Sequence, residues 1–224
     1  MFNEILWLAM LITTYSFLVI LFLFFKKTGL FAWIAVSIII ANIQVLKQIT
    51  IFGINATLGN IIYASAYIAT DILSEFYGKK TSKNAVYIGF ISFIVFTVLT
   101  NAQIYFMSNK TEENFKSLES IFSSIPALLI ASLTAYIVSQ LHDVYLYQFI
   151  KNKFPRFLFF RTNGSTLVSG LIDTIIFVSI ATYFQVFPKQ AFLDIVISTY
   201  LIKGFAGILG TPFIYFVKYI KIQK

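Results

Sequence analysis

Several ionisable side chains interrupt the long apolar stretches of this sequence. Asp71, Asp173 and Lys203 lie well inside such stretches. A charge at the centre of a membrane costs roughly 2.5 to 3.5 kcal/mol, so it normally faces a bundle interior or water and often marks a functional site. Carboxylates and ammonium groups in such places can bind a polar solute, pair with each other or carry a proton. The side chains in question are Lys47, Asp71, Glu75, His142, Asp143, Asp173 and Lys203.

The stretch "YASAYIATDILSEFYGKK", residues 63–80, carries two of these acids on a predicted helix. Tyr63, Tyr67, Asp71 and Glu75 follow one another at steps of four, which places them on one helix face. At about 1.5 Å rise per residue, Asp71 lies about 9 Å from the basic end of the helix and Glu75 nearly at it. Depth favours Asp71 as the functional acid, although it could also be a hydrogen-bonded anchor between helices. Glu75 could be an interfacial carboxylate beside Lys79, so we expect Asp71→Asn to impair transport more than Glu75→Gln.

Asp173 and Lys203 are the most central charges. Asp173 shares a predicted helix face with Thr166, Ser169 and Gly170, a pattern that fits either a binding surface or a close helix-packing seam. A buried Lys203 requires a partner acid or a lowered pKa. Asp173 and Asp71 are both candidates for that partner, and the sequence does not choose between them.

Two further positions carry charge near the ends of predicted helices. Asp143 lies on a polar stripe but only about seven residues from a basic loop, so a salt bridge to that loop is the alternative to a binding role. Lys47 shares a face with Gln44 and either lines a site or extends its ammonium group to the membrane surface. The lone His142 fits a hydrogen-bonded helix residue better than a ligand. The stripe around Asp143 consists of Tyr136, Ser139, Gln140, Asp143 and Tyr147.

The elements that must position these residues are membrane-spanning helices. The 224-residue chain is 58% hydrophobic and 18% aromatic, and about 20 apolar residues are enough to cross a hydrocarbon core of roughly 30 Å. We predict an all-α, polytopic transmembrane helix bundle that forms a single integral membrane domain over residues 1–224. A re-entrant hairpin at 53–55 would reduce seven spans to six. The predicted spans are 4–25, 30–52, 56–77, 84–107, 124–150, 164–186 and 192–217.

Basic residues recur in alternate loops of this predicted bundle. They follow the first, third and fifth spans and fill the C-terminal tail, whereas the other connections are short or acidic. The positive-inside rule then places the N-terminus outside and the C-terminus in the cytoplasm. The basic residues are Lys26, Lys27, Lys79, Lys80, Lys83, Lys151, Lys153, Arg156, Arg161, Lys218, Lys221 and Lys224.

Most catalytic chemistry has no visible machinery in this sequence. There is no Cys, no phosphate-binding glycine loop, no HExxH, no paired-His spacing and no GxSxG. The GxGD pattern of intramembrane aspartyl proteases is missing around both Asp71 and Asp173. We therefore predict that the protein is not an enzyme and uses no metal or cofactor. Charges of both signs with many hydroxyl, amide and tyrosine groups indicate a cavity for a small neutral or zwitterionic solute.

Four stretches carry a resemblance to a known family. "YIATDILSEFYGKK", "LTAYIVSQLHDVYLYQFIK", "RTNGSTLVSGLIDTIIF" and "YLIKGFAGILGTPFIYF" resemble, in order and spacing, the bacterial queuosine precursor transporters, also described as vitamin uptake transporters. The resemblance covers about residues 40 to 220. Gln140 departs from it, since some relatives have an acid there. The family pattern falls on Asp71, Glu75, Gly78, Ser165, Thr166, Asp173, Thr174, Lys203 and Pro212.

The resemblance implies import of a 7-deazaguanine across the inner membrane, such as preQ0 (the cyano precursor), preQ1 (the aminomethyl precursor) or the base queuine. A desolvated carboxylate of Asp173 or Asp71 could accept hydrogen bonds from the donor edge of such a base. Lys203 would balance the charge, and Tyr63 or Tyr67 would stack on the ring. The predicted substrate-binding residues are Gln44, Lys47, Tyr63, Tyr67, Asp71, Glu75, Asp143, Ser165, Thr166, Asp173, Thr174 and Lys203.

The source of energy stays open at the level of sequence. We expect a secondary carrier in which an acid carries a coupling proton. The alternatives are a membrane subunit energised by a separate ATPase, and a scaffold that transports nothing and uses its charges to hold helices together. The expected partners are a deazapurine, the lipid bilayer and a coupling proton, with no nucleic acid.

Overall fold

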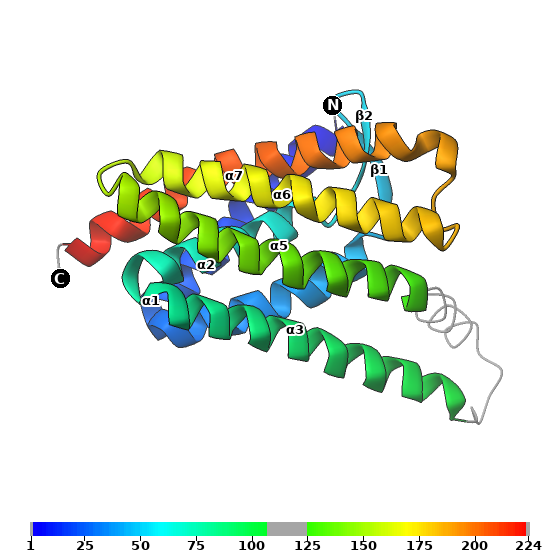
Figure 1. Ribbon diagram of the computed structural model, residues 1–224, viewed down its shortest axis with the longest axis horizontal. Helices are drawn as coiled ribbons and strands as arrows, with labels where there is room; N and C mark the ends of the chain where they lie inside the picture. The colour runs from blue at the N-terminus through cyan, green and yellow to red at the C-terminus, as the bar shows by residue number, and fades with distance from the viewer. Residues whose placement is uncertain (1, 107–124, 223–224) are drawn as a thin grey trace.

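The computed structural model describes residues 2–106 and 125–222, and long helices make up most of this part of the chain. The helices lie side by side along the long axis of the molecule (Figure 1). This architecture confirms the predicted all-α class. The helices are α1 (Phe2–Gln44), α2 (Asn60–Phe76), α3 (Gly78–Ala102), α5 (Ile125–Lys153), α6 (Leu158–Tyr183) and α7 (Phe192–Ile222), with 3-10 turns at Gln103–Tyr105 and Lys189–Ala191.

Helix α1 consists of two helices joined by a sharp kink. Lys26 has φ 53° and ψ −129°, far from helical values, at the basic junction between the first two predicted spans. The second of these helices ends at Gln44, not at the predicted residue 52. Within the described residues, four helical stretches are long and apolar enough to cross a membrane: Phe2–Gln44, Gly78–Tyr105, Leu158–Tyr183 and Lys189–Ile220. The count of six or seven spans therefore stays a prediction.

A short antiparallel hairpin replaces the end of the span predicted at 30–52 and the start of the span predicted at 56–77. β1 (Gln48–Ile51) pairs with β2 (Ile54–Thr57), and Gln48 lies opposite Thr57. Apolar and polar residues alternate along both strands (QITI and INAT), and the β-branched Ile and Thr residues among them favour strand over helix. Phe52 and Gly53 form the two-residue turn, both with positive φ, as tight hairpins require. Asn3 donates a hydrogen bond of 3.1 Å to the backbone oxygen of Thr50. The hairpin therefore lies at the end of the bundle where the chain begins (Figure 1).

Helix α2 is the most enclosed element of the fold. Every residue from Asn60 to Ser74 is buried, because α1, α3, α5, α6 and α7 all contact this helix. The outer helices, by contrast, expose large apolar side chains such as Phe24, Leu99 and Leu193. This distribution suits a lipid environment, in which the polar face of α2 is turned toward the bundle interior.

One close helix contact gives a prediction about stability. The Tyr15 ring of α1 lies against Gly210 of α7, and a Cβ added at Gly210 would lie 2.5 Å from the Tyr15 Cζ. We expect Gly210→Ala to lower the free energy of unfolding by about 1 to 3 kcal/mol through overpacking. Thermal unfolding in detergent measures this. Gly170→Ala is the matched control, since nothing lies within 4 Å of an added Cβ there; equal melting temperatures for the two variants would contradict the prediction.

Candidate functional site

The polar face of α2 meets the other helices at three successive levels. Tyr63, Tyr67, Asp71 and Glu75 occupy this face as the four-residue spacing predicts, and three of the four are completely or almost completely buried. Tyr63 contacts a charged pair from α6 and α7, and Tyr67 donates a hydrogen bond to Ser139 of α5. Asp71 faces an acid of α5, and Glu75 binds basic residues at the opposite end from the hairpin. A polar path therefore runs through the middle of the bundle.

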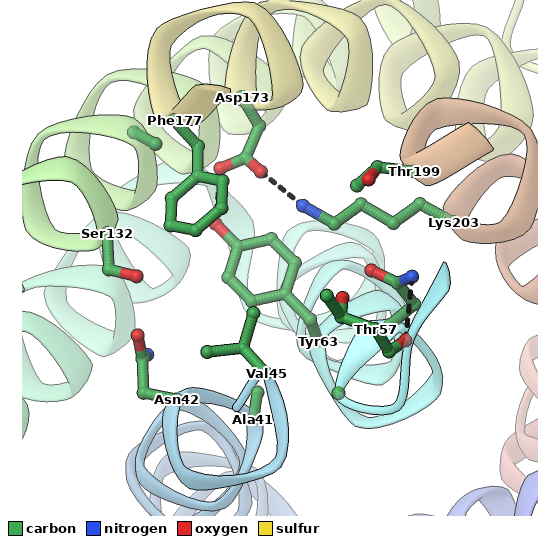
Figure 2. Close-up of a pocket in the computed structure, with 13 residues that line it drawn as sticks. Ala41, Asn42, Val45, Thr57, Tyr63, Ser132, Asp173, Phe177, Thr199 and Lys203 are labelled. Atoms are coloured by element: carbon green, nitrogen blue, oxygen red, sulfur yellow. Dashed lines mark hydrogen bonds and ion pairs between the residues drawn. The ribbon is translucent and has the colours of Figure 1, made fainter. Parts of the chain in front are cut away.

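Asp173 and Lys203 form the first level. The Lys203 Nζ lies 2.6 Å from Asp173 Oδ2, so the partner of Lys203 is Asp173 and not Asp71. Tyr63 donates its hydroxyl hydrogen to Asp173 Oδ1, and Ser139 donates to the same oxygen at 2.9 Å. Figure 2 shows Tyr63, Asp173 and Lys203 pointing toward one another from three helices. Asp173 is 1% exposed, and its three donors match the requirements of a buried carboxylate.

A pocket opens beside this charged pair. Its volume is about 40 Å³, whereas small-molecule pockets usually begin at about 300 Å³. The contacts among Tyr63, Asp173 and Lys203 therefore fill most of the site, and a ring-sized ligand has to displace them. The pocket is lined by Ala41, Asn42 and Val45 of the α1 end, Thr57, Gly59, Asn60 and Tyr63 of the hairpin and α2, and Ser132, Ala135, Asp173, Phe177, Thr199 and Lys203 of α5, α6 and α7 (Figure 2).

A larger groove adjoins the pocket at the hairpin end. It has a volume of about 700 Å³ and lies between the hairpin and the connection from α6 to α7. Thr57 and Thr199 line both the groove and the pocket. The charged pair therefore lies next to a space that opens on the hairpin side of the bundle.

Asp71 and Asp143 form the second level. Both side chains are fully buried, and none of their carboxylate oxygens has a hydrogen-bond partner among the described residues. Asp143 acts electrostatically on Asp71. The salt bridge from Asp143 to the basic loop, an alternative at the level of sequence, is not found within the described part of the chain. The hydrogen-bonded anchor role considered for Asp71 is not found there either.

Glu75 forms the third level and binds four side chains. Its Oε1 lies 2.5 Å from Arg161 Nη2 and 3.4 Å from Lys218 Nζ. Its Oε2 lies 3.2 Å from Lys151 Nζ and accepts the Tyr147 hydroxyl at 3.0 Å. This cluster ties α2 to α5, α6 and α7 at the basic end of the bundle.

The alternative pairing of Glu75 with Lys79 does not describe this end of the molecule. The Lys79 Nζ lies 3.5 Å from the centroid of the Tyr145 ring, while the four partners of Glu75 come from α5, α6 and α7. Arg161 was predicted to lie in a loop before a helix beginning at 164. The helix α6 begins at Leu158, so Arg161 lies in its first turn and is 1% exposed.

Comparisons with known proteins give the family. A family described as "Putative vitamin uptake transporter" matches residues 57–217. A Bacillus subtilis (strain 168) protein named "Probable queuosine precursor transporter" is 38% identical over 220 residues, covering 97% of this chain and 96% of that protein. The chain belongs to this transporter family. A Haemophilus influenzae protein of the same name is 25% identical over 160 residues, 70% of this chain and 66% of that protein. No solved structure matches.

Family membership makes this chain a membrane transporter and not an enzyme. In this transporter, some of the predicted binding residues lie outside the pocket. Lys47 is exposed in the turn after α1, where it was predicted to lie within a helix. Gln44 does not contribute to the pocket lining. The hydroxyls of Ser165 and Thr174 donate to backbone oxygens of their own helix.

Other predicted residues of the transporter lie close to the charged pair. Thr166 and Tyr67 line a small cavity behind Lys203, together with Tyr63. Sequence reasoning missed several lining residues, although Phe177 lies four residues after Asp173 and Thr199 lies four before Lys203. This helical spacing could have found both of them. The other missed lining residues are Asn42, Thr57 and Ser132.

Proposed function

We propose that this transporter imports a 7-deazaguanine queuosine precursor (preQ0, preQ1 or queuine) across the inner membrane. The observation that carries the proposal is the buried Asp173–Lys203 pair beside a pocket that adjoins an open groove. The names of the two relatives support the substrate class. The chain would act as a single transport unit over its whole length.

The substrate would bind by replacing contacts that Asp173 already makes. A deazaguanine presents N–H and NH₂ donors on one edge, and a carboxylate accepts two such donors side by side. The base would displace the Tyr63 hydroxyl and the Lys203 ammonium group from Asp173, and Lys203 would then donate to the carbonyl of the base. The rings of Tyr63 and Phe177 would stack on the flat substrate. Asp71, Glu75 and Asp143 would act at the deeper levels.

The charges at the two ends of the bundle support an orientation in the membrane that suits import. Lys151, Arg161 and Lys218 gather around Glu75 at one end, and the positive-inside rule assigns that end to the cytoplasm. The C-terminus would then be cytoplasmic and the hairpin would face outward. In this orientation the pocket would adjoin an outward groove and the Glu75 cluster would close the inner end, which is the arrangement expected before substrate enters from outside.

We expect this chain to restore tRNA modification in a strain that makes no deazaguanine and lacks its own importer. The strain is supplied in turn with preQ0, preQ1 and queuine, and queuosine in tRNA is measured. Lys203→Met should abolish the signal because Asp173 loses its counter-charge. The matched control is Lys153→Met, an exposed lysine, which should restore modification fully. Restoration by Lys203→Met at equal membrane abundance would contradict the proposed site.

The mode of energy supply needs a second measurement. We propose an autonomous secondary carrier, so the purified chain in liposomes should take up the precursor that restores tRNA modification in cells. Uptake in cells without uptake in liposomes would indicate a separate ATPase partner. A protein that binds no precursor and loses only folded yield when its charges are neutralised would be the scaffold considered at the level of sequence.

A further inference from the structure

Two buried acids lie between the pocket and the Glu75 cluster without hydrogen-bond partners. Asp71 and Asp143 are each 0% exposed, and all four of their carboxylate oxygens lack a partner among the described residues. Buried polar groups are almost always hydrogen-bonded, and the effective penalty for an unpaired buried charge is several kcal/mol. Two neighbouring ionised carboxylates without donors are therefore a high-energy arrangement.

The groups around the acids do not supply the missing positive charge. Around Asp71, Arg161 of α6 is the cation that acts on it, but its guanidinium already binds Glu75, Tyr147 and the backbone oxygen of Pro155. Glu75, on the same helix as Asp71, adds a further negative charge. From α5, Tyr147 is held by its bond to Glu75.

The nearby hydroxyls also leave the acids without donors. Thr162 of α6 faces Asp71, is 0% exposed, and its hydroxyl is itself without a partner of good geometry. Ser165 and Ser169 lie near Asp143, but the Ser165 hydroxyl donates to the Thr162 backbone oxygen and the Ser169 hydroxyl is hydrogen-bonded to the His142 ring. On the α2 side, the Tyr67 hydroxyl donates to Ser139. What these two acids lack is a donor hydrogen and one unit of positive charge.

A single proton supplies both. We propose that the Asp71–Asp143 pair binds the proton that this transporter carries with its substrate, an inference that rests on the proposed transport function. One carboxyl then donates its O–H to the other carboxylate or to Thr162, and the pair holds one negative charge instead of two. The O–H bond formed when the proton is loaded from the outer water breaks when the proton is released on the inner side, and no other bond changes.

Tyr67, one helical turn before Asp71, begins a chain of hydrogen bonds that ends at Asp173 in the pocket wall. Tyr67, which is electrostatically coupled to both Asp143 and Asp173, donates to the Ser139 oxygen at 2.9 Å. Ser139 donates to Asp173 at 2.9 Å. A substrate that displaces the donors of Asp173 would change the hydrogen bonds of Ser139 and Tyr67, and with them the surroundings of Asp143. Bound substrate would therefore change the affinity of the acid pair for the proton. By linkage, the bound proton would change the affinity for substrate by the same factor.

The test begins with binding, which separates this inference from the proposed function. Binding of preQ0, preQ1 and queuine to the purified wild-type protein is measured by calorimetry, and the tightest binder is used afterwards. If none of the three binds, the proposed function fails and the inference fails with it. If one binds and is transported with no proton movement, only the inference is overturned.

Proton movement is then measured in liposomes that contain a trapped pH-sensitive dye. We expect substrate added outside to acidify the lumen of wild-type liposomes. In Asp71→Asn and Asp143→Asn this proton flux should fall roughly tenfold or more, while exchange of labelled for unlabelled substrate continues. Lys153→Met, which changes an exposed lysine outside the pocket and the groove, should behave as wild type. Proton flux retained in both Asp variants, or uptake that requires sodium and ignores a pH gradient, would overturn the inference.

Infrared spectroscopy gives a readout that needs no transport. A protonated carboxyl has a C=O stretching band that an ionised carboxylate lacks, and we expect wild-type protein at neutral pH to show it and Asp71→Asn to lose it. The Asn amide can donate to Asp143, so this variant should fold as stably as wild type. Absence of the band in the wild-type protein at neutral pH would overturn the inference even if no variant could be purified.

Discussion

Asp173→Asn is expected to reduce the affinity for the transported precursor by roughly a hundredfold, a loss of about 3 kcal/mol. Asp173 is the acceptor for Tyr63, Ser139 and Lys203 at once, and Asn offers one oxygen in place of two charged ones. The donor edge of a deazaguanine would then meet an NH₂ group where it needs an acceptor. Calorimetric titration of the purified variant measures the effect.

The folding cost of this change has to be separated from its effect on binding. Asp173→Asn leaves the Lys203 ammonium group, whose side chain is 12% exposed, without its counter-charge, which costs about 3 to 5 kcal/mol when one partner of a buried pair is removed. The double variant Asp173→Asn with Lys203→Met removes both charges. We expect it to recover most of the lost thermal stability without recovering binding. Recovery of wild-type affinity in the double variant would show that the pair only holds helices together.

The three levels of the polar path were largely predictable because helical spacing is a local property. Tyr63, Tyr67, Asp71 and Glu75 repeat every four residues, so their common face follows from helix geometry alone. The cost of a charge in an apolar stretch likewise singled out Asp173 and Lys203.

What was not predictable depends on contacts between distant helices. The choice of Asp173 over Asp71 as the partner of Lys203 depends on how α6 and α7 pack against α2, and nothing local encodes that. Arg161 was placed in a loop because an arginine near basic residues usually lies at a membrane surface. The helix begins six residues earlier than predicted, since Glu75 of α2 supplies the charge that lets Arg161 be buried.

The hairpin was missed for a different reason. The residues from Gln48 to Thr57 are too apolar to be distinguished from helix by hydropathy, and the prediction therefore continued the preceding span to residue 52. The signal was the alternation of apolar and polar residues on both sides of Phe52 and Gly53, a pattern typical of two strands joined by a two-residue turn. The consequence is functional, because the hairpin places Thr57 in the wall of the pocket.

Glu75→Gln is expected to lower the free energy of unfolding by about 3 to 5 kcal/mol, because it leaves the buried Arg161 charge without compensation. Arg161→Met should be milder, since Glu75 keeps Lys151 and Lys218, whose side chains are 26% and 32% exposed. We expect this difference in unfolding free energy between the two variants because Glu75 contacts three other helices at once. Thermal unfolding of both variants measures it, with Asp194→Asn as the exposed-acid control. The sequence alone led us to expect that Asp71→Asn impairs transport more than Glu75→Gln, and that expectation concerns transport, not stability.

The same Glu75 substitution should open the basic end of the bundle to water. The chain contains no Cys, so a single introduced thiol reports on one position only. Ser74 is suitable because it is 0% exposed and adjacent to Glu75. We expect the Ser74→Cys thiol to resist a membrane-impermeant maleimide applied from the basic side and to react once Glu75→Gln is added. Arg161→Met should give an intermediate rate, because two of the three ion pairs remain. If Glu75→Gln destabilised the protein and left the thiol protected, the cluster would hold helices together without controlling access to the inner end of the polar path.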